Sequence, residues 1–297
     1  MMSYASVVEP LRAANQLSQK VLYDIRHIPV AGASAVSSGG AVIKANAHVG
    51  ERVDFDLVLV VAGGDPMSFY DKRVFQWLRH LSGRGVRLGG VSGGPVILVL
   101  AGLMRGRRMT VHWEYAAALG AFSPSLMLER TLYVIDRDRM TCAGGIAPLD
   151  MMHAMLSEHH SGDFARQVSD WFMHTEIRPS GGPQRAGLVE RYGTTSPPVI
   201  LAIEAMTNHI ADTLDLEQLA SLVNVSPRQL NRLFRDKLGK TTMGFYRDLR
   251  LDKARSLLTQ SSLSTTEIAL ITGFSSSAHF SQSFRQKFSA TPSSLRA

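Results

Sequence analysis

The segment Gly90-Val91-Ser92-Gly93-Gly94 has the spacing of a nucleophile elbow, the G-x-S-x-G turn that presents a serine between a strand and a helix. Such a serine attacks a carbonyl carbon when a histidine takes its proton and a carboxylate orients that histidine. His112 is the nearest candidate base, with Glu114 two residues later. Gly63 and Gly64 could supply the amides of an oxyanion hole. No other feature of the sequence ties these residues into a triad.

A second kind of chemistry is indicated in the last hundred residues, which align with themselves at a shift of 49 to 50 positions. Asn224 matches Gly273, and Phe234-Arg235 matches Phe284-Arg285. Each copy has helical periodicity, a tight turn and a second helix opened by serine, which is typical of a helix-turn-helix. Residues 242–260 between the copies predict one helix of about 28 Å, near the ~34 Å spacing of successive major-groove faces.

The second helix of each copy has an apolar stripe and a polar face. Arginine and asparagine on such a face can make bidentate contacts to guanine and adenine, and serine can contact bases or phosphates. A solvated amphipathic helix would explain one copy alone, but not two at matched spacing. The first copy has the stronger base-reading set, and the second is more permissive. We expect DNA contacts from Ser226, Arg228, Asn231, Arg232, Arg235, Ser277, Ser281, Gln282 and Arg285.

The elements that must position these groups fall into three segments: a domain at 1–177, a linker at 178–198 and a helical domain at 199–297. Proline and glycine in the linker leave no periodicity. The first domain alternates strands and helices, which predicts a three-layer α/β fold with a mostly parallel sheet. Its expected strands are 24–30, 55–62, 86–91, 109–112 and a hairpin of 126–136 with 139–143, and its expected helices are 70–81, 95–103, 148–158 and 163–174, after an opening helix that contains Val7 and Leu11.

Composition excludes several classes of protein. The chain has 297 residues, of which 45% are hydrophobic and 19% charged, so it is globular rather than disordered. Its longest apolar stretch, 96–104, is far short of the roughly 20 residues of a membrane span. There is no cationic leader, and the one cysteine, Cys142, cannot form an internal disulfide, so we expect a cytoplasmic protein. Of 32 basic and 25 acidic residues, 12 and 8 lie in 199–297, which places over half of the net charge of +7 there.

Residues 199–297 resemble the DNA-binding domain of the AraC/XylS family. The likeness rests on the segments 215–220, 226–234, 250–255 and 267–274. The family's closing signature is present as Phe288, Pro292 and Arg296, whereas Ser289 stands where glycine is usual and Leu295 where an aromatic residue is common. The resemblance implies a transcription regulator with double-stranded DNA as partner, and activation rather than repression. It also implies a homodimer that works with RNA polymerase.

The segments 62–65, 90–94 and 101–114 resemble the class I glutamine-amidotransferase-like superfamily, and most closely the intracellular-protease-like domains of GlxA-type regulators. Catalytic relatives have cysteine where this chain has Ser92, and proteolytic relatives have histidine where it has Gly93. The resemblance therefore implies no enzyme and no cofactor, but a retired active site that senses a metabolite. The alternative is a serine hydrolase or amidase that uses Ser92 and carries an accessory DNA-binding module.

A ligand in an open α/β sheet binds at the carboxyl ends of the strands. The helix that starts near Gly93 would offer free amides to a carboxylate. Trp113 would hold an ammonium group by cation–π attraction, with Glu114 or Glu9 as counter-charge, unless it packs in the core. Relatives in this family govern amine, betaine or amino-acid catabolism, so we expect such an effector. The expected ligand-binding residues are Glu9, Gly63, Gly64, Ser92, Gly93, His112 and Trp113.

Other candidate sites are weaker. His153, His159 and His160 lack the cysteine or carboxylate partners of a zinc site, so we expect no metal. Cys142 is expected to be buried. Domains of this superfamily begin with a central strand, whereas this sequence opens in a helix, so we hypothesise a misassigned start codon and a strand of about ten residues upstream.

Overall fold

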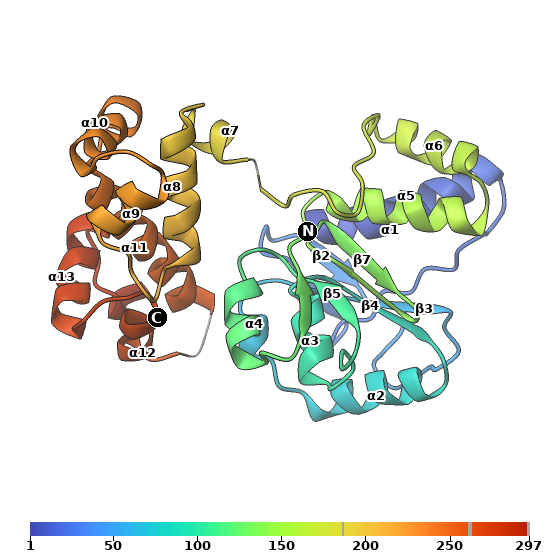
Figure 1. Ribbon diagram of the computed structural model, residues 1–297. Coiled ribbons are helices and arrows are strands. Elements are labelled where there is room, and N and C mark those ends of the chain that lie inside the picture. Colours follow the sequence, from blue (N-terminus) through green and yellow to red (C-terminus); the bar gives the residue numbers. More distant parts are fainter. Residues whose placement is uncertain (186, 261–262, 296–297) are drawn as a thin grey trace. The chain divides into compact units, whose positions relative to one another are not determined.

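The computed structural model describes residues 1–185, 187–260 and 263–295. The chain divides into two compact units, Met1–Gln184 and Arg185–Ala297 (Figure 1). The first unit contains a mostly parallel sheet with helices on both faces, and the described residues of the second form helices and turns. The predicted α/β fold followed by a helical domain is confirmed.

Four strands form the central sheet of the first unit in the order β3-β4-β8-β7. β3, β4 and β8 are parallel, and β7 is antiparallel to β8. Two small sheets pair β1 with β2 and β5 with β6. The bounds are β1 Ser34–Val36, β2 Val42–Lys44, β3 Leu57–Ala62, β4 Arg87–Ser92, β5 Arg108–Thr110, β6 Met127–Glu129, β7 Tyr133–Asp136 and β8 Arg139–Cys142.

Side chains alternate between two apolar cores, one on each face of this sheet. In β4, Leu88 joins the core formed with α2, α3 and α4, and Val91 joins the core formed with α1 and α5. This period of two is what a strand buried on both faces requires. Figure 1 shows the resulting three layers. The helices are α1 Met2–Ser18, α2 Lys72–Gly83, α3 Gly94–Leu100, α4 Ala116–Phe122, α5 Ala147–His159 and α6 Gly162–Trp171, with a short η1 at Pro66–Ser68.

Two expectations for the first unit are wrong. Asp24–Val30 is not a strand, because the side chain of Asn46 takes its backbone groups: Asn46 accepts from the amide of His27 and donates to the carbonyl of Ile25. The expected strand 126–136 is two strands, β6 and β7, that belong to different sheets. The expected strand 55–62 is present as β3; among the described strands it pairs only with β4, and Val61 is 37% exposed.

Two parts of the expected linker, 178–198, associate with the units that flank it. Its first residues are hydrogen-bonded to the first unit, and α7 (Leu188–Tyr192) lies within it. Leu188 and Tyr192 pack against the core of the second unit. The division between the two units falls inside this segment, at Gln184.

The second unit contains the two expected helix-turn-helix copies. The first is α9 with α10, and the second is α12 with α13. Asn224 and Gly273, the matched turn residues, have φ angles of 54° and 75°, so the backbone is left-handed at both. Capping boxes open both first helices, Asp215 with Gln218 and Ser264 with Glu267. The bounds are α8 Pro197–Asn208, α9 Leu216–Leu222, α10 Pro227–Leu238, α11 Thr242–Gln260, α12 Thr265–Ile271, α13 Ser277–Phe288 and η2 Ser293–Leu295.

α11 is the predicted helix between the copies, and both copies pack against it. Phe234 of α10 contacts Phe245 near the start of α11, and Arg255 near its end lies over the ring of Phe288 in α13. Arg296, the last residue of the expected closing signature, lies outside the described residues. None of the helices in the described part of the chain has the length and apolar character that a membrane span needs.

Candidate functional site

The outer face of α10 carries three exposed arginines that have no hydrogen-bond or ion-pair partner among the described residues. These are Arg228, Arg232 and Arg235. Leu230 and Phe234, on the opposite side of the helix, are fully buried. The helix therefore has a fixed inner face and an outer face of guanidinium groups, each of which presents a planar set of donors.

Two cations of α11 and α13, Arg250 and Lys287, have partners inside the unit. Arg250 donates to the carbonyls of Thr272 and Gly273 and lies over the ring of Phe274. Burial lowers the pKa of Arg250. Lys287 forms an ion pair with Asp252 at 2.6 Å. These cations hold the turn of the second copy and fasten α13 to α11, so they position the outer face of the unit without belonging to it.

Asn231, expected to contact bases, has a partner inside the fold. It is half-buried, and its Oδ1 accepts a hydrogen bond of 3.0 Å from the amide of Thr242, at the start of α11. A bidentate adenine contact needs the oxygen and the nitrogen of the amide together. With the oxygen committed, Asn231 caps the next helix, a role that helical periodicity alone could not reveal.

The outer face of α13 is less basic, as the sequence predicts. Ser277, Gln282 and Arg285 are exposed, and Ser281 is half-buried. The helix is capped by the hydroxyl of Ser276, which accepts from the amide of His279. Ser226 caps α10 in the same way, so its hydroxyl hydrogen remains available for a phosphate.

Two exposed residues near the starts of these helices escaped the sequence prediction. Gln229 in α10 and His279 in α13 occupy matched positions of the repeat. The signal that could have found them is the register of the repeat, because a position that faces outward in one copy does so in the other.

In the first unit, the carboxyl ends of β3, β4 and β8 converge around Ser92. Ser92 has a φ of 61°, the left-handed backbone of a nucleophile elbow. Gly144 after β8 has a φ of 92°, and a Cβ there would lie 2.7 Å from that of Ser92. Ser3 of α1 accepts a hydrogen bond of 2.8 Å from the amide of Gly145. Ser3, Gly144 and Gly145 were not singled out from sequence, since only the sheet brings them to Ser92.

The geometry does not complete a catalytic triad. The amide of His112 donates to the carbonyl of Ser92 at 3.3 Å, and His112 Nδ1 lies 3.7 Å from Glu114 Oε2. No hydrogen bond joins the hydroxyl of Ser92 to the imidazole of His112 in the described residues. Burial lowers the pKa of His112, and the nearby charge of Glu114 only partly opposes that shift. A neutral imidazole could accept a proton, but among the described residues it makes no hydrogen bond to the hydroxyl of Ser92.

The start of α3 offers fewer amide donors to the expected carboxylate than a regular helix N-terminus does. The amide of Gly93 already donates to the carbonyl of Ala62 at 2.9 Å, and Pro95 has no amide hydrogen. α3 is also only seven residues long, which limits its dipole.

The aromatic end of the expected pocket is better supported. Trp113 is 41% exposed, so the alternative that it packs in the core is wrong. Its ring lies beside that of His112, with centroids 5.2 Å apart. Glu9 is paired with Arg12 of its own helix at 2.7 Å, so its charge is already compensated. Of the two carboxylates expected to balance the charge of a bound ammonium group, Glu114 is therefore the better candidate. Gly63 and Gly64 follow β3, and the carbonyl of Gly64 accepts a hydrogen bond from the hydroxyl of Tyr115.

Comparisons with known proteins decide the family. A model described as the DJ-1/PfpI family matches residues 3–158, and one described as a helix-turn-helix domain matches residues 219–297. The HTH-type transcriptional regulator GlxA of Rhizobium meliloti is 45% identical over all 297 residues, which cover 92% of that protein. The HTH-type transcriptional regulator CdhR of Pseudomonas aeruginosa is 39% identical over the same length, covering 88%. The chain belongs to the HTH-type transcriptional regulators.

Solved structures show the same fold for this regulator. An AraC family transcriptional regulator from Pseudomonas putida aligns with a TM-score of 0.53 at 22% identity, over 58% of this chain and 92% of that one. A THiJ/PfpI family protein from Pseudomonas syringae aligns with a TM-score of 0.51 at 21% identity, over 75% and 86% of the two chains. The relatives are regulators by name, and the hydrolase alternative finds no support among them.

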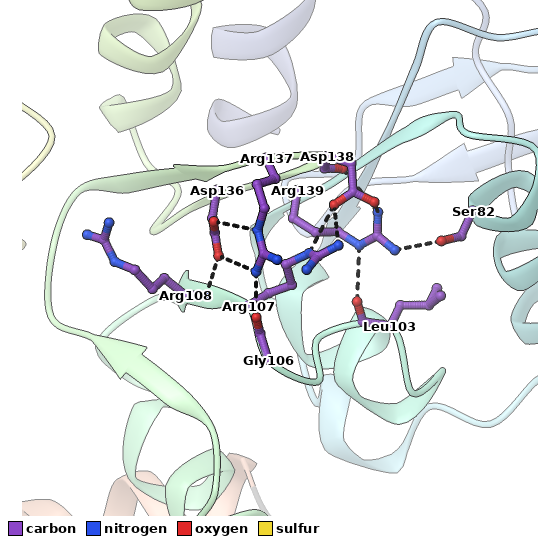
Figure 2. A network of polar contacts seen from close by, with 9 residues as sticks. All are labelled: Ser82, Leu103, Gly106, Arg107, Arg108, Asp136, Arg137, Asp138 and Arg139. Carbon is purple, nitrogen blue, oxygen red and sulfur yellow. Dashed lines mark hydrogen bonds and ion pairs between the residues drawn. The ribbon is translucent and has the colours of Figure 1, made fainter.

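The arginines at the opposite end of the regulator's sheet form an internal scaffold (Figure 2). Asp138 pairs with Arg107 and with Arg139, both at 2.7 Å. Arg139 is buried and also donates to the hydroxyl of Ser82 and to the carbonyl of Leu103. These contacts join the β7–β8 turn to α2 and to the loop after α3. Because its donors are satisfied within the unit, this cluster differs from the open face of α10.

The remaining expectations concern metals and thiols. In the part of the chain that the structure describes, no three histidine, cysteine or acidic side chains are grouped to hold a metal ion. His159 and His160 instead both contact the hydroxyl of Tyr23, and His153 contacts that of Ser169. Cys142 is fully buried, and burial raises the pKa of its thiol to about 12, so it is not a reactive thiolate.

Proposed function

We propose that this regulator changes the transcription of its target genes when a small ammonium compound, an amino acid, amine or betaine, binds beside Ser92. The observation that carries the proposal is the half-exposed ring of Trp113, next to His112 and the carboxylate of Glu114, close to the strand ends where α/β sheets bind ligands. An aromatic face with a nearby carboxylate is the arrangement that attracts a quaternary or primary ammonium group.

The same proposal assigns DNA recognition to the outer faces of α10 and α13. Arg228, Arg232 and Arg235 would enter one major groove, and Ser277, Gln282 and Arg285 the next. Among the described residues the α10 arginines have no hydrogen-bond or ion-pair partner, which supports this, because such a guanidinium is available for guanine edges and phosphates. We further propose a homodimer that activates RNA polymerase and works in the cytoplasm, where its DNA target lies.

Isothermal titration of the full chain with glycine betaine and with L-arginine tests the effector class. We expect one of them to bind, and Trp113→Ala to weaken that binding by roughly tenfold, the scale of a cation–π contact. Trp171→Ala is the matched control, because Trp171 is exposed to a similar extent, 47% against 41%, but lies on α6. No binding of either compound, or an equal loss in both variants, would refute the assignment.

A further inference from the structure

The last residues of the first unit are fastened back onto it. We call residues 174–184 the strap; they follow α6 and precede Arg185, the first residue of the DNA-binding unit. At the beginning of the strap, Asp150 Oδ1 accepts from His174 Nε2 and from the amide of Arg178, both at 2.9 Å. Asp150 Oδ2 accepts from the guanidinium of Arg178 at 2.7 Å. Asp150 is completely buried in the first turn of α5, so this end of the strap is firmly held.

The middle and the far end of the strap are held along β5 and β7. The carbonyl of Ser180 accepts from the amide of Leu132 at 2.9 Å. The side-chain amide of Gln184 donates to the carbonyl of Thr131 at 2.8 Å, to the hydroxyl of Thr110 at 3.0 Å and to the carbonyl of Val111 at 3.1 Å. Gln184 is thus inserted into the first unit as the last residue before the DNA-binding unit begins.

Both fastening points adjoin the proposed effector site. Val111, which Gln184 contacts, is followed directly by His112, and the amide of His112 is bonded to the carbonyl of Ser92. Asp150 lies in the helix that follows Gly144 and Gly145, the turn packed against Ser92 and Ser3. A ligand that displaces either segment therefore acts on a group that holds the strap.

The far end of the strap is held less completely than its beginning. Gln184 Oε1 and Thr131 Oγ1 are buried and have no hydrogen-bond partner in the described part of the chain. The two hydrogens of the Gln184 amide are shared among three oxygens. When the strap leaves, Gln184 Oε1 reaches water, which offsets part of the cost of the broken bonds. This end is therefore the one from which the strap opens.

We infer that the strap couples the effector site to the DNA-binding unit, and that Gln184 is its release point. The inference rests on the proposed function, since it describes how the site beside Ser92 is read out. Release of residues 179–184 would add up to about 20 Å of reach to the connection with α7. That length is a little over half a turn of B-DNA. It would therefore change which pairs of half-sites the two DNA-binding units of a dimer can bind at the same time.

Hydrogen exchange of the full chain tests the coupling without any effector. The amides of Leu132 and Arg178 report on the strap, and the amide of His112 reports on the site, because each is bonded in the contacts above. We expect Gln184→Ala to accelerate exchange at Leu132 and His112 by at least about tenfold, and to affect Arg178 less because Asp150 still holds it. Gln76→Ala, the same substitution at an exposed position of α2, should accelerate none. Faster exchange at the strap with no change at His112, or no change at the strap, would overturn the coupling.

If Gln184→Ala unfolds the first unit, exchange will be faster throughout α2. A second variant, on the effector-site side, then tests the same coupling. Coupling between two sites must act in both directions. Trp113→Ala should therefore accelerate exchange at Leu132 and Arg178, and an unchanged rate at both amides would contradict the inference. Because neither measurement uses a ligand, failure of both betaine and arginine to bind would refute the proposed effector class and leave this result standing.

The consequence for the DNA-binding unit is measured as a distance distribution. Cys142 is buried and does not compete for labelling, so Lys72→Cys in α2 and Arg247→Cys in α11 can each carry a spin label. We expect Gln184→Ala to broaden the distribution between the labels and Gln76→Ala to leave it unchanged. A distribution that stays the same in both variants would show that the strap does not set the reach of the second unit.

Discussion

Arg232 illustrates how one side chain can serve DNA binding without serving the fold. It is exposed on α10 and forms no internal contact among the described residues. We expect Arg232→Ala to weaken binding to the specific operator by about 1–3 kcal/mol and to leave the free energy of unfolding within about 0.5 kcal/mol of wild type. Fluorescence anisotropy with labelled operator DNA and urea unfolding measure the two effects.

The control for this prediction is Arg166→Ala, which removes an exposed arginine from α6 of the first unit. It should leave operator affinity unchanged at fixed salt. If the two variants lose the same affinity, the effect belongs to the overall charge of the chain and not to the face of α10.

The glycine after β8 shows how closely the backbone is packed around Ser92. A Cβ on Gly144 would lie 2.7 Å from Ser92 Cβ and 2.9 Å from Ser3 Oγ, and the φ of 92° is unfavourable for alanine. We expect Gly144→Ala to lower the free energy of unfolding by about 2–4 kcal/mol, because strain and overpacking add. Gly63→Ala is the control: a Cβ there meets no atom within 4 Å, and urea denaturation should show little change. A tolerated Gly144→Ala would mean that the turn is not constrained in this way.

The contacts of α10 with α11 decide what Asn231 does. Because its side chain satisfies an amide in the first turn of α11, Asn231→Ala should cost about 1 kcal/mol of stability, the usual cost of a lost helix cap. Thermal unfolding should show a lower midpoint for this variant and an unchanged one for Arg232→Ala. If Asn231 reads adenine instead, its variant will keep its midpoint and lose discrimination at a single base pair, which a gel-shift series with substituted operators would detect.

The helices of the second unit could be predicted from sequence because their signals are local. Periodicity fixed α10 and α11, and the repeat placed the turns at Asn224 and Gly273. The role of Asn231 could not be predicted in this way, since its partner belongs to the next helix. In the first unit, local patterns found β4 and the elbow at Ser92, whereas the convergence of Ser3 and Gly144 on that serine depends on the sheet.

Errors in the first unit have the same origin. Asp24–Val30 has the composition of a strand, but a strand also needs a neighbour with free backbone groups, and Asn46 takes that place. The split of β6 from β7 depends on which sheet each one joins, and periodicity contains no information on that choice. The sequence could therefore suggest candidate residues around Ser92, but not the hydrogen bonds that already use Gly93 and Glu9.

Across the whole molecule, basic side chains have two roles: some are available to bind DNA, and others join elements of the fold. Residues 199–297 contain 12 basic and 8 acidic side chains, and the exposed arginines of α10 are free of internal partners among the described residues. The arginines around Asp138 in the first unit instead form ion pairs and hydrogen bonds that join elements of the fold, as Figure 2 shows. Net charge alone does not distinguish an arginine available for DNA from a structural one. The internal partners of each guanidinium distinguish them.

The first unit should lose stability in mild acid. Burial lowers the pKa of both His112 and His153 below the ordinary value of 6.5. The unfolded chain therefore binds protons at a higher pH than the folded unit does, so stability falls as pH drops through about 6.5 towards the lower folded value. Calorimetry between pH 7.5 and 5.5 should show a falling midpoint for the first unit. His112→Gln should reduce that fall, whereas His80→Gln, at an exposed position of α2, should retain it. A midpoint that rises on acidification, or a slope that His112→Gln leaves intact, would show that His112 is not held neutral by burial beside Ser92.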